Sequence, residues 1–456
     1  MRDQGDPDRL LTKSISAFSE AIMNDLKVSR FTLAEPLPGR TVGLFNTLTR
    51  ALGAIPAEVW DLAVAGRLDG DEIVNELAAQ GFLIDSGLDE DLILAHWRAS
   101  QAYDLTHLKY LVSPTHACNM ACSYCVHGRK KRAKHMSPDK ARSVLEFILT
   151  DLEVKQPQTA RLDFCGAEAL LNPRVMLYLA EGLSRFCRGQ GIDFKISLIT
   201  NGLGLKPDLI QTLNPLGLES VRVTISGPAE IHNKYRPAKD NRPTYDRIMN
   251  NLAEVAGLTK ISIQGQYNPA NGEHLRFPEL LDDLTAQGLK DQVADVSFGP
   301  FVPFESTRDK GAASATAPIG CLVDEEPGRC LWLQDQIAGR GFTHSQGPPS
   351  NNCLACYRNS MVIDVEGQIT VCPSMMDYPE LEYGHVTRGV DFYREAALLA
   401  RDLPEKCRQE CALAPLCDGG CRHQALIRSG DFNGVNCLGR TYEHLTRAYI
   451  RQAVRI

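Results

Sequence analysis

The chain has 456 residues, 43% of them hydrophobic, so it can bury more than one core and we expect two to four domains. Its 49 basic and 56 acidic side chains are interspersed, with a net charge of -7, and they form no basic stripe that would follow a phosphate backbone. No run approaches the roughly 20 apolar residues that cross a bilayer, and residues 1–20 lack a secretory signal pattern. We therefore expect a cytoplasmic protein without nucleic-acid or membrane partners.

The first hundred residues predict a small α/β domain, which we place at residues 1–105. Its pattern indicates a hairpin near 28–45 and helices near 57–66 and 70–80.

Residues 106–304 alternate short apolar runs rich in β-branched residues with helix-length stretches. The expected strands are 108–113, 160–165, 194–199, 221–225, 260–266 and 294–299. Apolar residues at three- and four-residue spacing over 138–153 and 174–188 predict helices packed on a sheet. The alternation is typical of parallel β/α units, and it stops near Pro300. An incomplete (β/α)6 TIM-like barrel therefore fits better than a closed barrel of eight units.

Residues 305–350 are rich in Gly, Ala, Ser, Thr and Pro and predict a linker with at most one helix, near 328–338. Residues 351–456 then show short strands, loops and closely spaced cysteines. Such a segment has little apolar surface of its own, so we expect a C-terminal domain stapled by metal. A hairpin over 362–372 turns at Gly367.

The 15 cysteines are the most informative feature of the composition. Without an export signal they would stay reduced, and clustered thiolates bind metal. Four of them stand apart and are interpreted as buried small hydrophobic residues, namely Cys165, Cys187, Cys321 and Cys330. The others fall into an early group of three and a late group of eight.

The early group is Cys118, Cys122 and Cys125, on the loop that follows the first expected barrel strand. Barrel enzymes place their chemistry at that end of the strands. A four-iron cluster usually takes four cysteine ligands, so three of them leave one iron open for an outside ligand. The alternative is a zinc site that uses His116 or His127 as its fourth ligand.

This spacing on this loop resembles the radical S-adenosylmethionine (radical SAM) superfamily, and the resemblance covers about 108–300. Cys165 to Leu170 is similar to the family's Gly-Gly-Glu-Pro-Leu segment, with Ala167 and Ala169 as departures. The resemblance implies that the expected cofactor-binding residues are Tyr124, Gly166, Ala167, Glu168, Asn201 and Thr224. Glu168 and Asn201 also have simpler interpretations, as a helix cap and a turn residue.

The chemistry implied by the resemblance is one-electron reduction of S-adenosylmethionine by a [4Fe-4S] cluster on Cys118, Cys122 and Cys125. The products are methionine and a 5'-deoxyadenosyl radical. Because that radical abstracts any nearby hydrogen atom, the protein must position the substrate and exclude water.

The late cysteines resemble the auxiliary-cluster extension called the SPASM domain, over about 350–445. Family precedent implies one further cluster on Cys353, Cys356, Cys372 and Cys421, and another on Cys407, Cys411, Cys417 and Cys437. Three [4Fe-4S] clusters in total would follow. The spacing from Cys407 to Cys411 is one residue longer than in the family, which leaves the last ligand set open, and zinc is the alternative metal.

Relatives with this extension mostly modify peptides or proteins by oxidation, cross-linking or rearrangement. We therefore expect a peptide or protein maturase, with a substrate encoded nearby and an electron donor such as flavodoxin or ferredoxin. The outline of a hairpin followed by helices in the N-terminal domain, with segment 44–49, is similar to leader-binding or substrate-gating regions of such relatives, and a strand edge there could take up an extended peptide. The alternative is a domain that only caps the barrel. The alternatives are a radical SAM dehydrogenase or mutase that acts on a small molecule, and a non-catalytic zinc-binding interaction protein.

One missing residue bears on the reaction type. In relatives that oxidise sulfatases, an Asp after the hairpin cysteine is thought to act as the base, whereas Pro373 follows Cys372 here. The nearest acid in sequence is Asp377, and we interpret Asp364 and Glu366 as solvent-facing strand and turn residues. The sequence thus predicts that this protein does not mature sulfatases.

Overall fold

A computed structural model describes residues 25–125, 133–301, 326–344, 347–350, 353–376 and 378–454. His127, Cys321, Asp377 and half of the expected linker lie outside these residues. Backbone contacts divide the chain into two compact units. Unit 1 contains residues 1–98, 403–418 and 442–456, and unit 2 contains residues 99–402 and 419–441.

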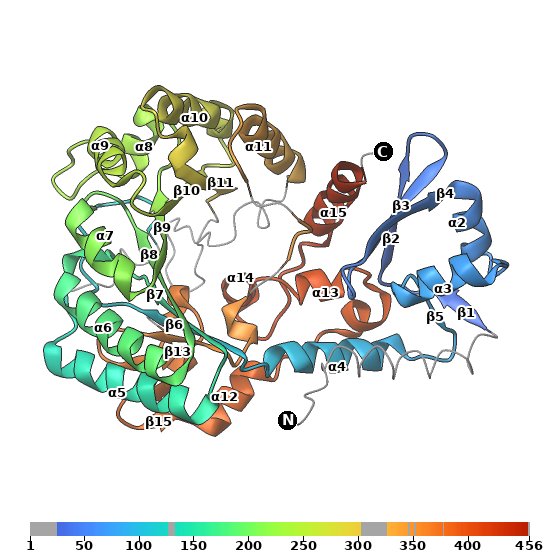
Figure 1. Ribbon diagram of the computed structural model, residues 1–456, viewed down its shortest axis with the longest axis horizontal. Helices are drawn as coiled ribbons and strands as arrows, with labels where there is room; N and C mark the ends of the chain where they lie inside the picture. The colour runs from blue at the N-terminus through green and yellow to red at the C-terminus, as the bar shows by residue number, and fades with distance from the viewer. Residues whose placement is uncertain are drawn as a thin grey trace, which may run out of the picture. The chain divides into compact units, whose positions relative to one another are not determined.

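Unit 2 is built on the expected parallel sheet (Figure 1). Its strands lie side by side in chain order: β6 (His107–Val112), β7 (Thr159–Phe164), β8 (Asp193–Thr200), β9 (Leu218–Thr224), β10 (Lys260–Tyr267) and β11 (Val293–Pro300). Every neighbouring pair in this series is parallel. The prediction of a partial (β/α)6 barrel is confirmed.

Helices cover the outer side of this sheet (Figure 1). They are α5 (Pro138–Lys155), α6 (Pro173–Gln190), α7 (Pro207–Leu213), α8 (Ala229–Tyr235), α9 (Tyr245–Val255), α10 (Phe277–Ala286) and α11 (Pro327–Gly339). Alternate strand residues such as Leu108, Tyr110 and Val112 face these helices and pack with Val144 and Ile148. The helices do not cover the opposite face of the sheet or the carboxyl ends of its strands, where a functional site can form.

A second set of strands extends this sheet beyond β6. They are β12 (Ser360–Ile363), β13 (Gln368–Thr370), β14 (Glu382–His385) and β15 (Gly389–Val390), followed by α12 (Phe392–Leu399). The β12–β13 hairpin turns at Gly367, whose φ of +84° favours glycine. The hairpin matches the expected one, but its parallel pairing with β6 is a feature that the sequence did not predict.

Unit 1 contains the N-terminal elements that were expected. Strands β2 (Thr32–Leu37), β3 (Thr41–Asn46) and β4 (Leu52–Pro56) form an antiparallel sheet in that order, and β1 (Leu26–Val28) pairs with β5 (Leu83–Asp85). Helices α2 (Ala57–Val64) and α3 (Asp71–Ala79) accompany them, as does α4 (Glu90–Ala102) up to residue 98. The core contains Val42, Leu44, Ile55 and Phe82.

Two late segments belong to the same unit. Helix α15 (Gly439–Ala453) reaches it from residue 442 onward, and there the Glu35 carboxylate accepts hydrogen bonds from Arg447 and Arg451. Segment 403–418 includes a π-helical turn, Lys406–Glu410, and α13 (Ala414–Cys417), and its Ala414 packs with Phe31 and Leu94. Helix α14 (Arg422–Ser429) belongs to unit 2. No helix in the described residues is long and apolar enough to span a bilayer.

Candidate active site

The early cysteines lie on the loop that leaves the carboxyl end of β6. The backbone N–H of Ala121 donates to the Pro237 carbonyl (2.8 Å), and that of Ser123 donates to the Tyr235 carbonyl (3.0 Å). Met120 also forms an isolated bridge with Ala238. The cysteine loop is thus held against the chain that follows α8, so its shape is fixed by the barrel.

Cys118 is in a partly buried position close to the other two cysteines. Its Sγ accepts hydrogen bonds from the backbone N–H of Met120 (3.4 Å) and from Nδ2 of Asn201 (3.7 Å). Burial raises the pKa of this thiol to about 11, and the nearby charges of Glu168, Cys122 and Cys125 add to the rise. A bound metal reverses that penalty, because it favours the thiolate. The three thiols and these N–H donors therefore fit an iron-sulfur cluster.

Gly166 follows β7 with a φ of +102°, and a Cβ there would collide with the Ser113 side chain. This position therefore needs glycine, as the resemblance implies. Ala167 follows in a half-buried position.

Glu168 is fully buried and joins the loops after β7 and β8. Its Oε1 accepts from Thr200 Oγ1 (2.7 Å) and from the N–H of Leu170 (3.2 Å), and its Oε2 accepts from the N–H of Asn201 (2.8 Å). The bond to Leu170 caps a short 3-10 helix, Ala169–Leu171, as the simpler interpretation expects. Burial raises the pKa of Glu168, although these bonds oppose the rise.

Tyr124 lies in an aromatic cluster at the edge of the loop. Its ring centroid is 4.2 Å from that of Phe301, and the Tyr235 ring is 5.0 Å from Phe301. Its hydroxyl bonds to Ser226 Oγ (2.9 Å) and accepts from an Arg236 guanidinium N–H (2.8 Å). The expected role of Tyr124 in cofactor binding stays a prediction, because within the protein its hydroxyl already bonds to Ser226 and Arg236 and its ring contacts Phe301.

Thr224 ends β9 in a half-buried position, and no hydrogen bond of its side chain is seen within the described residues. The hydroxyl that connects to the site is that of Ser226, two residues later. Sequence reasoning missed Ser226, His232 and Arg236. A signal was present, since His232 and Arg236 stand one helical turn apart just beyond a strand's carboxyl end.

Unit 2 brings one late cysteine group together. Cys353 begins the 3-10 helix Leu354–Cys356, and a hydrogen bond from Cys356, aided by backbone N–H groups of Arg422 and Ala355, lowers the pKa of Cys353 to about 6. Burial raises the pKa of Cys372 and that of Cys421, to about 11 for Cys421, and the charge of Cys353 adds to both. The four thiols predicted for the first auxiliary cluster are therefore neighbours.

Arg422 connects the pieces of chain that carry these thiols. It is fully buried, its guanidinium donates to the Ala355 carbonyl (2.6 Å), and it stacks 3.9 Å from the Phe432 ring centroid.

The structure does not bring the other late group together within one unit. Cys407, Cys411 and Cys417 belong to unit 1, and Cys437, which is exposed, belongs to unit 2. Among the described residues, no three His, Cys, Asp or Glu side chains converge on a single-ion site. Of the cysteines that stand apart in the sequence, Cys165 and Cys187 are free and buried, as expected, whereas Cys330 is buried but disulfide-bonded.

The expectation that Asp364 faces solvent is wrong, because only 6% of it is exposed. Its Oδ1 accepts the backbone N–H groups of Glu366 and Gln368 (both 2.9 Å), so the turn folds the carboxylate inward. Burial raises the pKa of Asp364, and the charges of His116 and His385 oppose the rise. Glu366 is partly exposed and pairs with Lys134. Pro373 starts a short 3-10 helix after Cys372.

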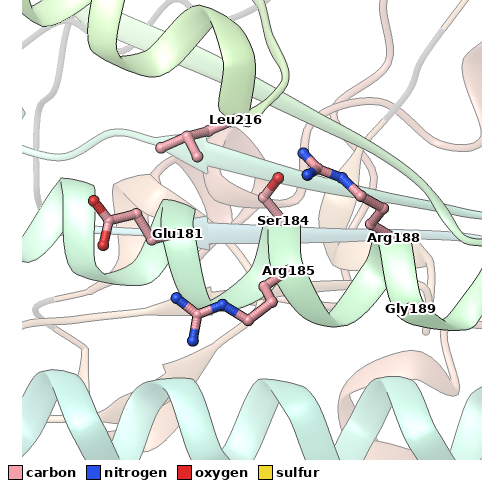
Figure 2. A pocket seen from close by; sticks show the side chains of 6 residues that line it. All are labelled: Glu181, Ser184, Arg185, Arg188, Gly189 and Leu216. Atoms are coloured by element: carbon pink, nitrogen blue, oxygen red, sulfur yellow. The ribbon is translucent and has the colours of Figure 1, made fainter.

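A surface hollow of about 400 Å³ lies elsewhere, along α6 (Figure 2). Glu181, Ser184, Arg185 and Arg188 line it from one helix, with Leu216 from the neighbouring segment. None of the expected site residues lines this hollow, so it is separate from the candidate active site.

Comparisons with known proteins agree with this geometry. The family model described as the radical SAM superfamily matches residues 112–264. A serine-type anaerobic sulfatase-maturating enzyme of Bacteroides thetaiotaomicron is 24% identical over 74% of this chain and 87% of its own length. A PqqA peptide cyclase of Ruegeria pomeroyi is 24% identical over 70% of this chain and 84% of its own.

Solved structures show the same fold. A structure of anSMEcpe with bound AdoMet has a TM-score of 0.56 and 18% identity, and covers 76% of this chain and 94% of that one. Streptococcus suis SuiB bound to its precursor peptide SuiA has a TM-score of 0.52 and 14% identity, covering 90% of this chain and 99% of that one. A radical SAM domain implies a [4Fe-4S] cluster and AdoMet, which the thiols of the β6 loop fit. Residues 112–264 are therefore a radical SAM domain.

Proposed function

We propose that this enzyme modifies a ribosomally made peptide or protein through a radical that starts at the β6 loop. The observation that carries the proposal is the convergence of Cys118, Cys122 and Cys125 with Asn201 and Glu168 at the carboxyl ends of β6, β7 and β8. The cluster and AdoMet, when bound, supply one-electron cleavage of the cofactor.

The protein's own side chains have separate tasks in this proposal. Cys118, Cys122 and Cys125 would hold three irons of the cluster, and Asn201 donates to the Cys118 sulfur. Gly166 has a positive φ and no room for a Cβ, so the backbone there would let the chain approach the cofactor closely. Phe301, Tyr124 and Tyr235 form an apolar wall that excludes water from a reactive site.

Two auxiliary clusters complete the proposal. The proximity of Cys353, Cys356, Cys372 and Cys421 supports the first of them. The second, on Cys407, Cys411, Cys417 and Cys437, rests on the resemblance alone. Because neither cluster would have an open iron, they would carry electrons, supplied by a donor such as flavodoxin or ferredoxin.

The N-terminal sheet supports a peptide partner. Its edge strand β2 is obstructed, because Arg447 donates to the Ala34 carbonyl (2.8 Å) and Pro36 has no N–H. Edge strand β4 pairs only with β3 among the described residues. An extended leader peptide could therefore add to the sheet along β4. The sulfatase-maturating, PqqA-cyclising and SuiA-binding relatives suggest the same substrate class.

A two-arm incubation tests the proposal. The enzyme, AdoMet and a reductant are mixed either with the peptide encoded beside its gene or with a sulfatase-motif Ser peptide. We expect a mass change in the first arm, and in the second 5'-deoxyadenosine without aldehyde, since Pro373 replaces the usual base. A hydrazine-trapped product lighter by two hydrogens in the second arm would contradict the predicted reaction type. Loss of that product in Asp364→Asn would then indicate that the buried Asp364 acts as the base. Absence of modification in both arms, with AdoMet still cleaved, would favour a small-molecule substrate.

A further inference from the structure

Arg222 lies in the middle of β9, on the inner face of the barrel sheet. Its neighbours Val221 and Val223 are fully buried and belong to the core beneath the helices, so the alternation of a strand turns Arg222 to the opposite face. Arg222 is exposed there, and within the described residues its guanidinium has no hydrogen bond or ion pair. Because inward-facing side chains normally fill a barrel, an exposed arginine at this point indicates open space.

Other cations on the same inner face have carboxylate partners in the protein. The pairs are Lys109 with Asp163 (3.1 Å), Arg161 with Asp163 (2.8 Å) and Lys195 with Asp193 (3.1 Å). The positive charge of each of these side chains is therefore compensated, whereas that of Arg222 is available to a ligand.

The strands on the two sides of Arg222 differ in chemistry. On β8, its register partner Ile199 packs against an apolar cluster of Leu111, Cys165, Val362 and Met376. On β10, its register partner is Ser262, whose hydroxyl donates to the Asp295 carboxylate of β11. Asp295 thus bonds to Ser262 and not to Arg222. A group with an aliphatic stem and an anionic end matches an apolar wall beside a free guanidinium.

Strand β9 also leads directly to the candidate active site. Thr224, two residues after Arg222, lies on the same face at the carboxyl end of the strand. The next inward residue, Ser226, bonds to the hydroxyl of Tyr124 on the cysteine loop (2.9 Å). At about 3.3 Å per residue, the Cα of Arg222 is about 7 Å further into the barrel than that of Thr224. A group bound by Arg222 would therefore be held inside the barrel, just below the site.

We propose that Arg222 determines substrate specificity by binding a carboxylate of the peptide substrate, from an Asp or Glu side chain close to the modified residue. The planar guanidinium donates two parallel hydrogen bonds to a carboxylate, and an Asn or Gln amide cannot accept both because one of its oxygens is replaced by a donor. This inference rests on the proposed function, since it requires that a peptide enters the barrel.

The test uses the reconstituted full chain with AdoMet, a reductant and the peptide encoded beside the gene. The peptide is used unchanged, with each Asp or Glu changed in turn to Asn or Gln, and with its C-terminal carboxylate amidated. The enzyme variants are Arg222→Gln, Arg222→Lys and, as a matched control, Arg247→Gln. Arg247 is an exposed arginine of α9 that also has no partner among the described residues. We would measure KM, kcat and the affinity for fluorescently labelled peptide, together with iron content.

We expect Arg222→Gln to raise the KM for the unchanged peptide and to weaken its binding about tenfold to hundredfold, because a charge-assisted pair is lost. The kcat and the iron content should change little, Arg222→Lys should recover part of the affinity, and Arg247→Gln should behave like the unmodified enzyme. One acid-to-amide peptide should lose as much affinity for the unmodified enzyme. Combined with Arg222→Gln it should lose little more, since both changes remove the same contact.

An unchanged KM in Arg222→Gln would overturn the inference, as would additive effects for every peptide variant. Non-additivity with the amidated peptide alone would overturn the assignment to an acidic side chain and place the chain end at Arg222. Failure of the unmodified enzyme to modify the peptide would instead refute the proposed function, and this inference with it.

Discussion

The two cysteine sites of unit 2 are built in different ways. Cys118, Cys122 and Cys125 lie on one short loop, and the barrel only has to fix the shape of that loop. Cys353, Cys356, Cys372 and Cys421 come from three places in the sequence, and they meet because the β12–β13 hairpin and Arg422 bring those places together. The comparison shows that a short spacing can define a site, whereas a dispersed set of ligands depends on the fold around it.

The largest effect is expected when the three cysteines of the β6 loop are replaced. Replacing Cys118, Cys122 and Cys125 with Ala should lower the bound iron from about 12 to about 8 per chain, because one of three four-iron clusters is lost. Formation of 5'-deoxyadenosine should cease. Iron analysis and chromatography of the cofactor products measure both. Cys187→Ala, a buried cysteine of α6, serves as the control. AdoMet cleavage that persists in the triple variant would show that the catalytic cluster lies elsewhere.

A smaller loss of activity, accompanied by a loss of solubility, is expected at the late group of Cys353, Cys356, Cys372 and Cys421. Cys421→Ala should remove about four irons and also lower solubility, because the proposed cluster ties three separate parts of the chain together. Iron content and the soluble fraction after expression check this result, again with Cys187→Ala for comparison. If both single variants are equally damaged, the assignment of Cys421 as a ligand is wrong.

The smallest effect concerns segment 403–418, which carries three of the cysteines predicted for the second auxiliary cluster. Thr47 Oγ1 donates to the Ala412 carbonyl within unit 1. Thr47→Val should therefore lower the free energy of local unfolding of segment 403–418 by about 1 kcal/mol. Trypsin should then cleave faster after Lys406 or Arg408. Thr150→Val, which removes an exposed hydroxyl on α5, is the matched control. An unchanged cleavage rate would mean that other contacts hold this segment.

Much of unit 2 could be predicted from sequence because its signals are local. The observed barrel strands agree with the predicted ones to within about three residues, since β-branched runs and helical periodicity define them. The pairing of β12 with β6 could not be predicted, because residues 360 and 109 are far apart in the chain and no pattern links them. The burial of Asp364 was missed because turn acids usually face water, and only the folded turn directs this one inward.

In the candidate active site, too, some residues have a local sequence signal and others do not. Cysteine spacing and the Gly166 segment carry motifs that a sequence displays directly. Arg236 is a single arginine after a short helix, and arginines are mostly exposed, so its burial is a property of the folded network around Tyr124 and Ser226.

The pairing of β12 with β6 also has a consequence for synthesis on the ribosome. Strand β6 ends at residue 112, but the strand that covers its outer edge begins at residue 360. Until that later strand emerges, the nascent barrel presents a row of unpaired backbone groups beside its cysteine loop, and such edges promote aggregation. A fragment that ended at residue 304 would keep this edge permanently open. The C-terminal extension therefore protects the barrel as well as carrying cysteines.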